Sequence, residues 1–409
     1  MLAPYAHRDF AIYSAATVVV YSALTVQSLG RVWLLQELTH SPFVIGLASA
    51  ASGLPVLVFG LFGGYLGDRY NRKAVLVTME SMAVAAAAVL AALALAGNVH
   101  AWHVLALTVA QGAALAVAAP IRQTLITDLV PQSEQRDALG QSALSGNVAG
   151  IVGATIGGLV LTFAGTTATL VTGAAVAVLA VPLLLLVRMS SSTLVADRNT
   201  NVLGGLREGV RYTLGDPVVR WLMLVTPLML IALSTRGVVY PAIVQDELGL
   251  GAGSLGLLEF AGAIGAVFGP LIFVTVSPKL GDYRLLLVAG FVFGATVVMM
   301  AYSPSLLVLA LFSTVTTCVG QVFFVTNWTA MQLRPPGPLR ARVVSVRFVI
   351  ASMQHLGIIA LGGLAQLTGP RIALSSFAIA GTVIFAATLL LLPPKGWTRS
   401  AGKERPGPA

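Results

Sequence analysis

Six ionisable side chains lie inside long apolar stretches of this sequence, away from the charged segments that separate the stretches. They are Arg31, Glu80, Arg122, Arg236, Glu259 and His355. An ionisable group inside a membrane costs several kcal/mol, so by default it marks a binding site or a path for ions. These residues are therefore the first candidates for substrate binding or proton transfer.

Arg236 and Glu259 fall in consecutive apolar segments, which would cross a membrane in opposite directions. Counting about 1.5 Å per helical residue inward from Glu247 and Gly251 places Arg236 about 16 Å and Glu259 about 12 Å below the outer surface. A buried carboxylate binds a proton more readily when no guanidinium is near, so breaking or making this contact would load or release a proton. The alternatives are a static pair that ties two helices, or a Glu259 that reaches the headgroups.

The other candidates have structural alternatives as well. Arg31, like Arg236, falls in the outer half of its segment, and two arginines in a cavity would suit an anionic or acceptor-rich solute. Glu80 and Arg122 lie nearer the inner surface, where snorkelling toward the headgroups or a structural role would also explain them. Uncharged polar residues extend the list, although each could instead bond a neighbouring helix. They are Gln27, Gln111, Asn147, Gln321, Asn327 and Gln354.

No group of residues predicts enzymatic chemistry. The five histidines show no metal-ligand spacing and no Walker loop is present, so we expect neither a metal, nor ATP coupling, nor a cofactor. The single cysteine, Cys318, lies in an apolar run and cannot form a disulfide within one chain. Glycine-rich runs such as Gly157-Gly158 are typical of close helix packing rather than of phosphate binding. The sequence predicts a protein that is not an enzyme.

The composition is that of a membrane protein with many crossings. Of the 409 residues, 57% are hydrophobic and only 10% are charged, whereas a soluble domain has about a quarter charged residues. Twelve apolar segments are each long enough to cross about 30 Å of hydrocarbon, and no cleavable signal peptide is evident. The segments are 10–38, 41–66, 73–96, 102–129, 134–163, 166–187, 218–245, 253–276, 284–302, 305–333, 342–367 and 371–392. We expect an all-α membrane protein with twelve transmembrane helices.

The loop cations indicate the orientation of these segments. If both termini are cytoplasmic, that side collects most of the loop cations, among them Arg8, Arg72 and Lys73, and the opposite side keeps only Arg371. Cations favour the cytoplasmic side of a membrane, so both termini are predicted inside. The net charge of +9 then indicates contact with anionic lipid headgroups rather than with nucleic acid.

One long polar interruption, from Arg188 to Arg220, divides the chain into two halves of six segments. Within it Leu203, Leu206, Val210 and Leu214 recur at helical spacing, which predicts an amphipathic helix on the cytoplasmic face. The predicted parts are an N-terminal half at 1–188, a linker at 189–217, a C-terminal half at 218–393 and a cytoplasmic tail at 394–409.

The two halves repeat each other. Gly157-Gly158-Leu159 matches Gly362-Gly363-Leu364, and Gln36-Glu37-Leu38 is echoed by Asp246-Glu247-Leu248. Repeated six-helix halves predict a pseudo-symmetric transporter with its substrate cavity between the halves at mid-membrane.

The loop between the second and third segments carries the pattern Gly64-x-x-x-Asp68-Arg69-x-x-Arg72-Lys73. Glycine permits close helix approach and a sharp turn, and an acid among cations can form a latch. The pattern resembles the loop between helices 2 and 3 of the major facilitator superfamily, except that Asn71 stands where the family usually has Gly. The resemblance implies an inner gate in which Asp68 faces the start of helix 11 and Asp128, ending helix 4, holds the basic residue. The alternative is an ordinary cytoplasmic loop whose charges only keep the loop in water.

Two further stretches narrow the resemblance. Pro120-Ile121-Arg122-Gln123-Thr124-Leu125 and Arg236-Gly237-Val238-Val239-Tyr240-Pro241 are similar to helices 4 and 7 of the group of enterobactin-exporter-like transporters and drug:proton antiporters. The resemblance covers nearly the whole chain and adds Gln123 to the candidate pathway residues. An acid common in helix 1 of this group falls at Leu24 here, so this position supplies no carboxylate for proton coupling.

Together these patterns predict a monomeric secondary active transporter of the bacterial inner membrane. We expect it to export an organic solute, such as a siderophore or an amphipathic drug-like compound, by alternating access with protons as the coupling ion. The alternative within transport is a lipid or metabolite facilitator without proton coupling. A membrane-embedded enzyme would need paired acids, a Ser/Lys or His cluster, or a metal site, and a non-transporting membrane sensor usually carries an appended output domain; the sequence shows none of these.

Overall fold

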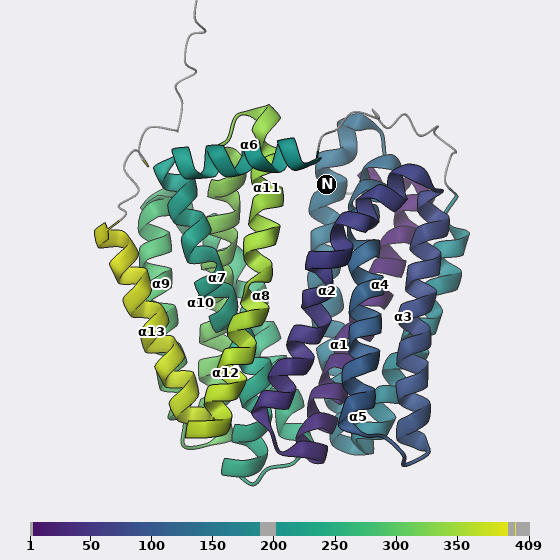
Figure 1. Ribbon diagram of the computed structural model, residues 1–409, viewed down its shortest axis with the longest axis vertical. Helices are drawn as coiled ribbons and strands as arrows, with labels where there is room; N and C mark the ends of the chain where they lie inside the picture. Colours follow the sequence, from purple (N-terminus) through teal and green to yellow (C-terminus); the bar gives the residue numbers. More distant parts are fainter. Residues whose placement is uncertain (1–2, 189–201, 392–396, 398–409) are drawn as a thin grey trace, which may run out of the picture.

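Twelve helical crossings form two bundles that stand side by side (Figure 1). The computed structural model describes residues 3–188, 202–391 and 397, with the side chains of some residues inside the helices left aside. Within the described residues the secondary structure is helical throughout. This confirms the predicted all-α membrane fold with two six-helix halves.

The N-terminal bundle contains α1 (Arg8–Thr39), α2 (Pro42–Arg69), α3 (Arg72–Leu95), α4 (Ala101–Asp128) and the long α5 (Gln135–Leu186). Short 3₁₀ turns precede α1 at Ala3–Ala6 and α5 at Gln132–Glu134. The chain of α5 turns at Gly165, whose φ is 81° and ψ is −175°, a conformation that only glycine adopts readily. The two arms of α5, residues 135–164 and 166–186, therefore make the fifth and sixth crossings, as predicted.

The C-terminal bundle contains α7 (Pro217–Ala242), the π-helical turn η3 (Ile243–Glu247), α8 (Ala252–Leu280), α9 (Asp282–Ala301), α10 (Leu306–Leu333), α11 (Gly337–Ser352), α12 (Gln354–Thr368) and α13 (Pro370–Leu391). The sequence predicts one segment at 342–367. In the structure α11 and α12 share this crossing, with a break at Met353.

Short polar residues start several of these helices. The side chains of Ser41, Asn71 and Asp216 accept hydrogen bonds from backbone N–H groups in the first turns of α2, α3 and α7. Such caps satisfy donors that the first turn of a helix leaves unpaired. Asn71, which stands where the family usually has Gly, is thus the N-cap residue of α3.

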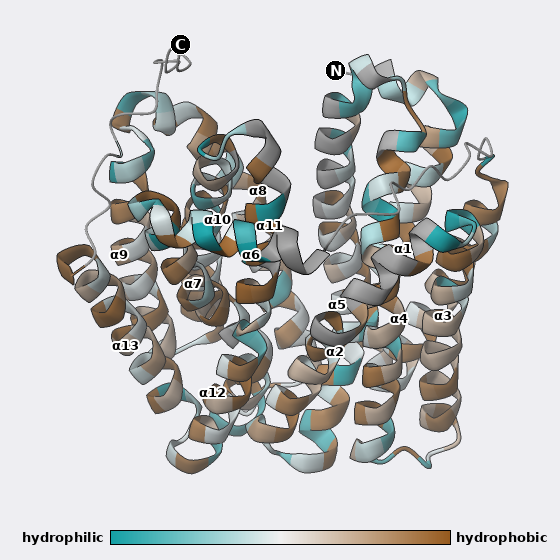
Figure 2. Ribbon diagram, turned by 45° about the horizontal axis from the view of Figure 1, so that its top comes forward, coloured by the Kyte–Doolittle hydropathy of each residue, from teal (hydrophilic) through white to brown (hydrophobic). Residues whose placement is uncertain are grey.

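Ten of the described helices are long and apolar enough to cross a membrane, and the corresponding described part of α2 is the shorter Pro42–Val56. The long α5 counts once among the ten but crosses twice. Large apolar side chains such as Phe163, Leu367 and Leu390 are exposed on the outside of the bundles. Figure 2 shows hydrophobic residues along the crossings and hydrophilic residues gathered around α6. A lipid environment is needed to cover these apolar surfaces.

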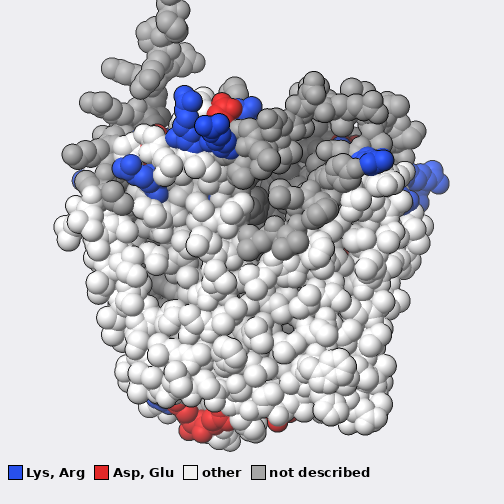
Figure 3. Space-filling model, in the orientation of Figure 1, with Lys and Arg blue, Asp and Glu red and all other residues white. Residues whose placement is uncertain are grey.

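Charges separate between the two ends of the molecule (Figure 3). The basic end, as we define it, carries Arg8, Arg72, Lys73 and Arg207 at the starts of α1 and α3 and on α6 (Val202–Gly215). The acidic end carries Glu37, Asp246 and Glu247 at the ends of α1 and η3. Arg371, the one loop cation predicted on the side opposite the termini, lies at the acidic end and pairs with Glu247.

The amphipathic helix α6 lies across the basic end of the C-terminal bundle (Figure 1). Glu208 of α6 pairs with Arg342 of α11, and a Cβ on Gly209 would lie 2.7 Å from the Arg342 carbonyl oxygen, so the two helices touch closely. Burial raises the pKa of the Tyr212 hydroxyl, the Asp216 carboxylate adds to the effect and Arg334 opposes it. Tyr212 is therefore neutral at physiological pH. The contacts of Glu208 and Gly209 with Arg342 attach α6 to the C-terminal half.

The predicted division into halves, linker and tail stays a prediction at its edges. Residues 189–201 of the predicted linker and most of the predicted tail lie outside the described residues. Of the tail, Trp397 is described, and its ring lies 6.1 Å from that of Trp221 and 5.5 Å from that of Tyr283, measured between centroids.

Candidate functional site

The two halves meet at the acidic end through glycines. A Cβ on Gly256 of α8 would lie 2.5 Å from the Cα of Gly158 in α5, and a Cβ on Gly46 of α2 would lie 3.0 Å from the carbonyl oxygen of Ile358 in α12. Backbones can approach this closely only where the side chain is absent. The α5–α8 and α2–α12 crossings together close this end of the molecule.

A polar contact joins the halves between these two crossings. Gln36 Nε2 of α1 donates to Asp246 Oδ2 of η3 at 2.8 Å, and His40 Nδ1 lies 3.2 Å from Asp246 Oδ1. Gln36 is fully buried although it ends a membrane crossing. The contact therefore belongs to the closed acidic end and links the last turn of α1 to the last turn before α8.

The bundles diverge toward the basic end (Figure 1), where Figure 3 shows the described Lys and Arg side chains gathered. At this end Arg72 Nη1 lies 2.7 Å from Asp128 Oδ2, so the acid that ends α4 holds a basic residue of the motif. Lys73 Nζ donates to the carbonyl oxygens of Leu185 and Val187, each at 2.7 Å, at the end of the second arm of α5. Arg69 is exposed, while Gly64 and the side chain of Asp68 lie outside the description.

A buried polar chain runs through the N-terminal bundle. Arg31 donates to Gln111 Oε1, Gln111 Nε2 donates to Gln27 Oε1 at 2.8 Å, and Gln27 Nε2 donates to the carbonyl oxygen of Gly173 at 3.1 Å. These bonds connect α1, α4 and the second arm of α5. Arg31, Gln27 and Gln111 are thus bound to one another inside one half, rather than spread over a cavity between the halves.

Glu80 of α3 and Arg122 of α4 form an ion pair inside the same bundle. Their side chains are only 3% and 12% exposed. The Tyr13 hydroxyl donates to the Arg122 carbonyl oxygen at 3.0 Å, and the Tyr21 ring centroid lies 5.4 Å from Arg122 Cζ. Neither side chain snorkels to the headgroups, because each is held by the other within the bundle.

A small cavity lies beside this pair. Its lining includes Glu80, Gln27, Gln111 and Leu24. The cavity therefore connects the ion pair with the polar chain of Arg31, and it contains the helix 1 position at which the resembling transporters carry an acid.

The candidates of the C-terminal half lie apart from one another. Asn327 Nδ2 donates to the Leu222 carbonyl oxygen and Asn327 Oδ1 accepts from Thr226, both at 3.2 Å, so this side chain bonds α10 to α7. Glu259 is half-buried and makes no hydrogen bond or ion pair among the described residues. Gln321 packs against Gly269 of α8, and a Cβ added to Gly269 would overlap the Cβ of Gln321.

His355 lies at the start of α12, directly after the break in the eleventh crossing. A Cβ on Gly53 of α2 would overlap the imidazole ring of His355, so the ring packs against the backbone of the opposite half. Gln354, beside it, accepts a hydrogen bond from Ser234 Oγ at 3.2 Å. Among the remaining candidates Gln123 is exposed on α4, whereas the side chains of Arg236 and Asn147 lie outside the described residues.

Sequence reasoning missed Arg347, which is only 3% exposed in α11. Its guanidinium carbon lies 4.2 Å from the ring centroid of Trp328 and 5.2 Å from that of Phe324, both on α10. A sequence signal exists, because Arg347 stands more than one helical turn inside an apolar segment.

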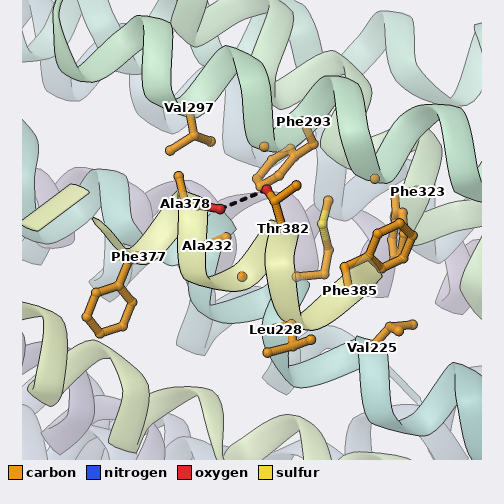
Figure 4. Close-up of a pocket in the computed structure, with 14 residues that line it drawn as sticks. Val225, Leu228, Ala232, Phe293, Val297, Phe323, Phe377, Ala378, Thr382 and Phe385 are labelled. Carbon is orange, nitrogen blue, oxygen red and sulfur yellow. Dashed lines mark hydrogen bonds between the residues drawn. The ribbon is translucent and has the colours of Figure 1, made fainter. Parts of the chain in front are cut away.

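A separate apolar cavity lies inside the C-terminal bundle between α7, α9, α10 and α13 (Figure 4). It contains about 420 Å³ of space without atoms, part of it open to the surroundings. Phe293, Phe323 and Phe385 line it, and the hydroxyl of Thr382 is already used to donate to the Ala378 carbonyl oxygen at 2.8 Å. This cavity offers no charged group to a solute.

Two six-helix bundles that touch through glycine crossings at one end and diverge toward the other define a secondary transporter of the major facilitator fold. The chain matches the family model described as transmembrane secretion effector over residues 1–399, and it belongs to that family of the major facilitator superfamily. It is an efflux transporter with several membrane crossings.

Named relatives agree with this assignment. The chain is 27% identical to the multidrug efflux pump Tap of Mycolicibacterium fortuitum over 88% of its own length and 89% of that protein. It is also 27% identical to the enterobactin exporter EntS of Shigella boydii, over 88% and 85% of the two chains.

Solved structures show the same fold. The nucleoside transporter NupG superposes with a TM-score of 0.74 at 12% identity, covering 94% of this chain and 98% of that one. A bacterial homologue of the lysosomal transporter Spinster, in an inward-facing and unoccupied conformation, superposes with a TM-score of 0.71 at 15% identity over 97% of both chains.

Proposed function

We propose that this transporter exports an organic solute from the cytoplasm of a bacterium in exchange for protons, by alternating access. The solute is a siderophore or an amphipathic drug-like compound, in keeping with the named activities of Tap and EntS. The protein acts as a monomer in the inner membrane. Both termini lie in the cytoplasm, because cations favour the cytoplasmic side of a membrane. The basic end then faces anionic headgroups and the cytoplasm, and solute enters from this end, toward which the two bundles diverge (Figure 1).

The observation that carries proton coupling is the buried ion pair of Glu80 and Arg122. A carboxylate that is 3% exposed inside a membrane remains ionised only while a cation lies beside it. Movement of α4 relative to α3 would separate the pair and make Glu80 take up a proton. Restoring the contact would release the proton, so a change in access becomes a change in proton occupancy.

The surroundings of Glu80 contain few other groups that could replace Arg122. From α1 the hydroxyl of Tyr13 and the ring of Tyr21 face the arginine. From the second arm of α5 the cavity beside Glu80 is lined by Ala177 and Ala180. Gln27 and Gln111 line the same cavity, and Arg31 donates to Gln111 rather than to Glu80. The protonation of Glu80 therefore depends mainly on the distance to the guanidinium of Arg122, its ion-pair partner.

Glu259 is the competing coupling acid. It is half-buried in α8, and the sequence predicts that it meets Arg236 at similar depth. Glu80 has the stronger geometric support, because its contact with Arg122 is observed, whereas the side chain of Arg236 lies outside the described residues.

Transport by inverted membrane vesicles tests both the function and the choice of acid. Ethidium and enterobactin serve as probes, with uptake driven by an inward-acid gradient and, separately, by counterflow without a gradient. We expect Glu80→Gln to lose driven uptake but retain counterflow, and Glu259→Gln to retain both. The reverse result would assign coupling to Glu259 instead. A wild-type protein whose uptake ignores the gradient would contradict proton coupling and leave the uncoupled facilitator.

A further inference from the structure

Arg347 of α11 is a buried cation that contacts aromatic rings. Its guanidinium carbon caps Trp328 at 4.2 Å and Phe324 at 5.2 Å from the ring centroids. The two rings lie one turn apart on α10, nearly parallel at 8°, with centroids 6.3 Å apart. Cation and rings together form one surface, which we call the Arg347 cluster, built from α10 and α11.

Among the residues that the structure describes, the guanidinium of Arg347 has no hydrogen-bond acceptor. It makes no hydrogen bond or ion pair with any residue that the structure describes, and its Nε is buried without a partner. In contrast, Arg122, Arg334 and Arg342 each meet a carboxylate. Cation–π contact satisfies the charge in part, but the five N–H donors of an arginine still need acceptor atoms. Buried donors without acceptors are costly, so the site favours a ligand that brings an anionic oxygen.

The Arg347 cluster lies partway along the eleventh crossing, counted from the basic end. Arg347 follows the start of α11 at Gly337 by ten residues, which places it about 15 Å along the helix axis. At the acidic end of the same crossing α12 packs against α2 through Gly362. Nearer the basic end α11 lies on the side of the C-terminal bundle that faces the N-terminal bundle (Figure 1). Trp328 and Phe324 are half-buried, so their rings keep surface that a ligand can cover.

We infer that the Arg347 cluster binds a planar aromatic anion, such as an aromatic carboxylate group of the exported solute. The flat guanidinium pairs with two oxygens at once, while the rings of Trp328 and Phe324 stack on the aromatic part. This inference rests on the proposed export of an organic solute and names the chemical class of that solute. The competing role is a static one, in which Arg347 only fastens α11 to α10.

Equilibrium binding to the purified full-length protein in lipid nanodiscs tests the site. Naphthoate is the anionic probe and naphthamide is its uncharged counterpart, each titrated by calorimetry without a proton gradient. We expect wild type to prefer naphthoate, and Arg347→Gln to weaken naphthoate about ten- to a hundredfold while naphthamide changes little. Arg342→Gln, on the same helix but with Glu208 as its partner, is the matched control and should leave both affinities unchanged.

Each other outcome contradicts the inference. Equal affinity of wild type for the two probes, or an unchanged preference in a folded Arg347→Gln, would assign Arg347 the static role. If Arg347→Gln does not fold, Trp328→Leu replaces it; it should weaken both probes alike, and unchanged binding would overturn the site. Because no gradient is applied, failure of proton coupling would leave these results intact. Conversely, driven uptake of ethidium with no naphthoate binding would refute only the Arg347 cluster.

Discussion

Alanine at Gly256 should selectively destabilise the closed acidic end. The added Cβ would lie 2.5 Å from Gly158 Cα and 3.0 Å from its carbonyl oxygen, whereas ordinary contacts begin at 3.4 Å. Both opposing atoms belong to the backbone, so no side chain can rotate away, and the helices must separate by about 1 Å. Overpacking of this kind costs about 1–3 kcal/mol, which changes the ratio of closed to open molecules by about 5- to 150-fold.

Pulsed EPR distances across the acidic end measure this shift. Spin labels at positions 163 and 367 suit the purpose, because Phe163 and Leu367 are 83% and 85% exposed and lie in different halves. Replacing Cys318, the single cysteine, by serine leaves only the introduced thiols for labelling. Gly256→Ala should transfer population from the short to the long distance and lower uptake in vesicles.

Gly150→Ala provides the matched control. Gly150 is also helical, in α5, but a Cβ there would meet no atom within 4 Å. Both variants gain the same intrinsic helix propensity, so a difference between them isolates the contact with Gly158. Identical distance distributions in the two variants would refute the idea that the glycine crossing closes this end.

Three further predictions concern the gates and the orientation. Asp128→Asn removes the carboxylate charge that pairs with Arg72 at 2.7 Å and should cut uptake sharply at normal expression, while normal uptake would argue against a gating role. Asp246→Asn weakens the contact with Gln36 and His40 and should shift the same EPR distances toward the open state by about 1 kcal/mol; an unchanged distribution would show that the glycines suffice. Reporters fused after Arg198 and Ala409 should read cytoplasmic and one near His100 periplasmic, and a periplasmic signal from the central loop would overturn the orientation.

The twelve crossings could be predicted because each depends on its own residues. In lipid a helix must satisfy its own backbone hydrogen bonds, so a long apolar run is sufficient evidence. The turn at Gly165 is also indicated by a single residue, because glycine adopts positive φ readily. The break at Met353 left none, because neither Met353 nor its neighbours Ser352 and Gln354 disfavour a continuous helix in the way that proline does.

The partners of the buried charges could not be predicted, because they depend on the rotation of each helix about its axis. Glu80 and Arg122 were both candidates, yet nothing in their spacing shows that α3 and α4 turn these side chains toward each other. Arg31 was expected in a cavity between the halves, and its bond to Gln111 places it in a network within one half. Asn327 bonds a neighbouring helix through Leu222 and Thr226, which is the alternative considered for this residue.

The internal repeat explains why the acidic end can close. Gln36 and Asp246 occupy corresponding positions of the two halves, and they meet across the molecule at 2.8 Å. Their neighbours Glu37 and Glu247 also correspond, and each is held within its own half, by Thr166 and by Arg371. Two acids at the meeting point would repel each other when both are ionised. Here the Gln36 amide donates to the Asp246 carboxylate, so a donor meets an acceptor. The difference between the two halves at this position therefore allows them to touch.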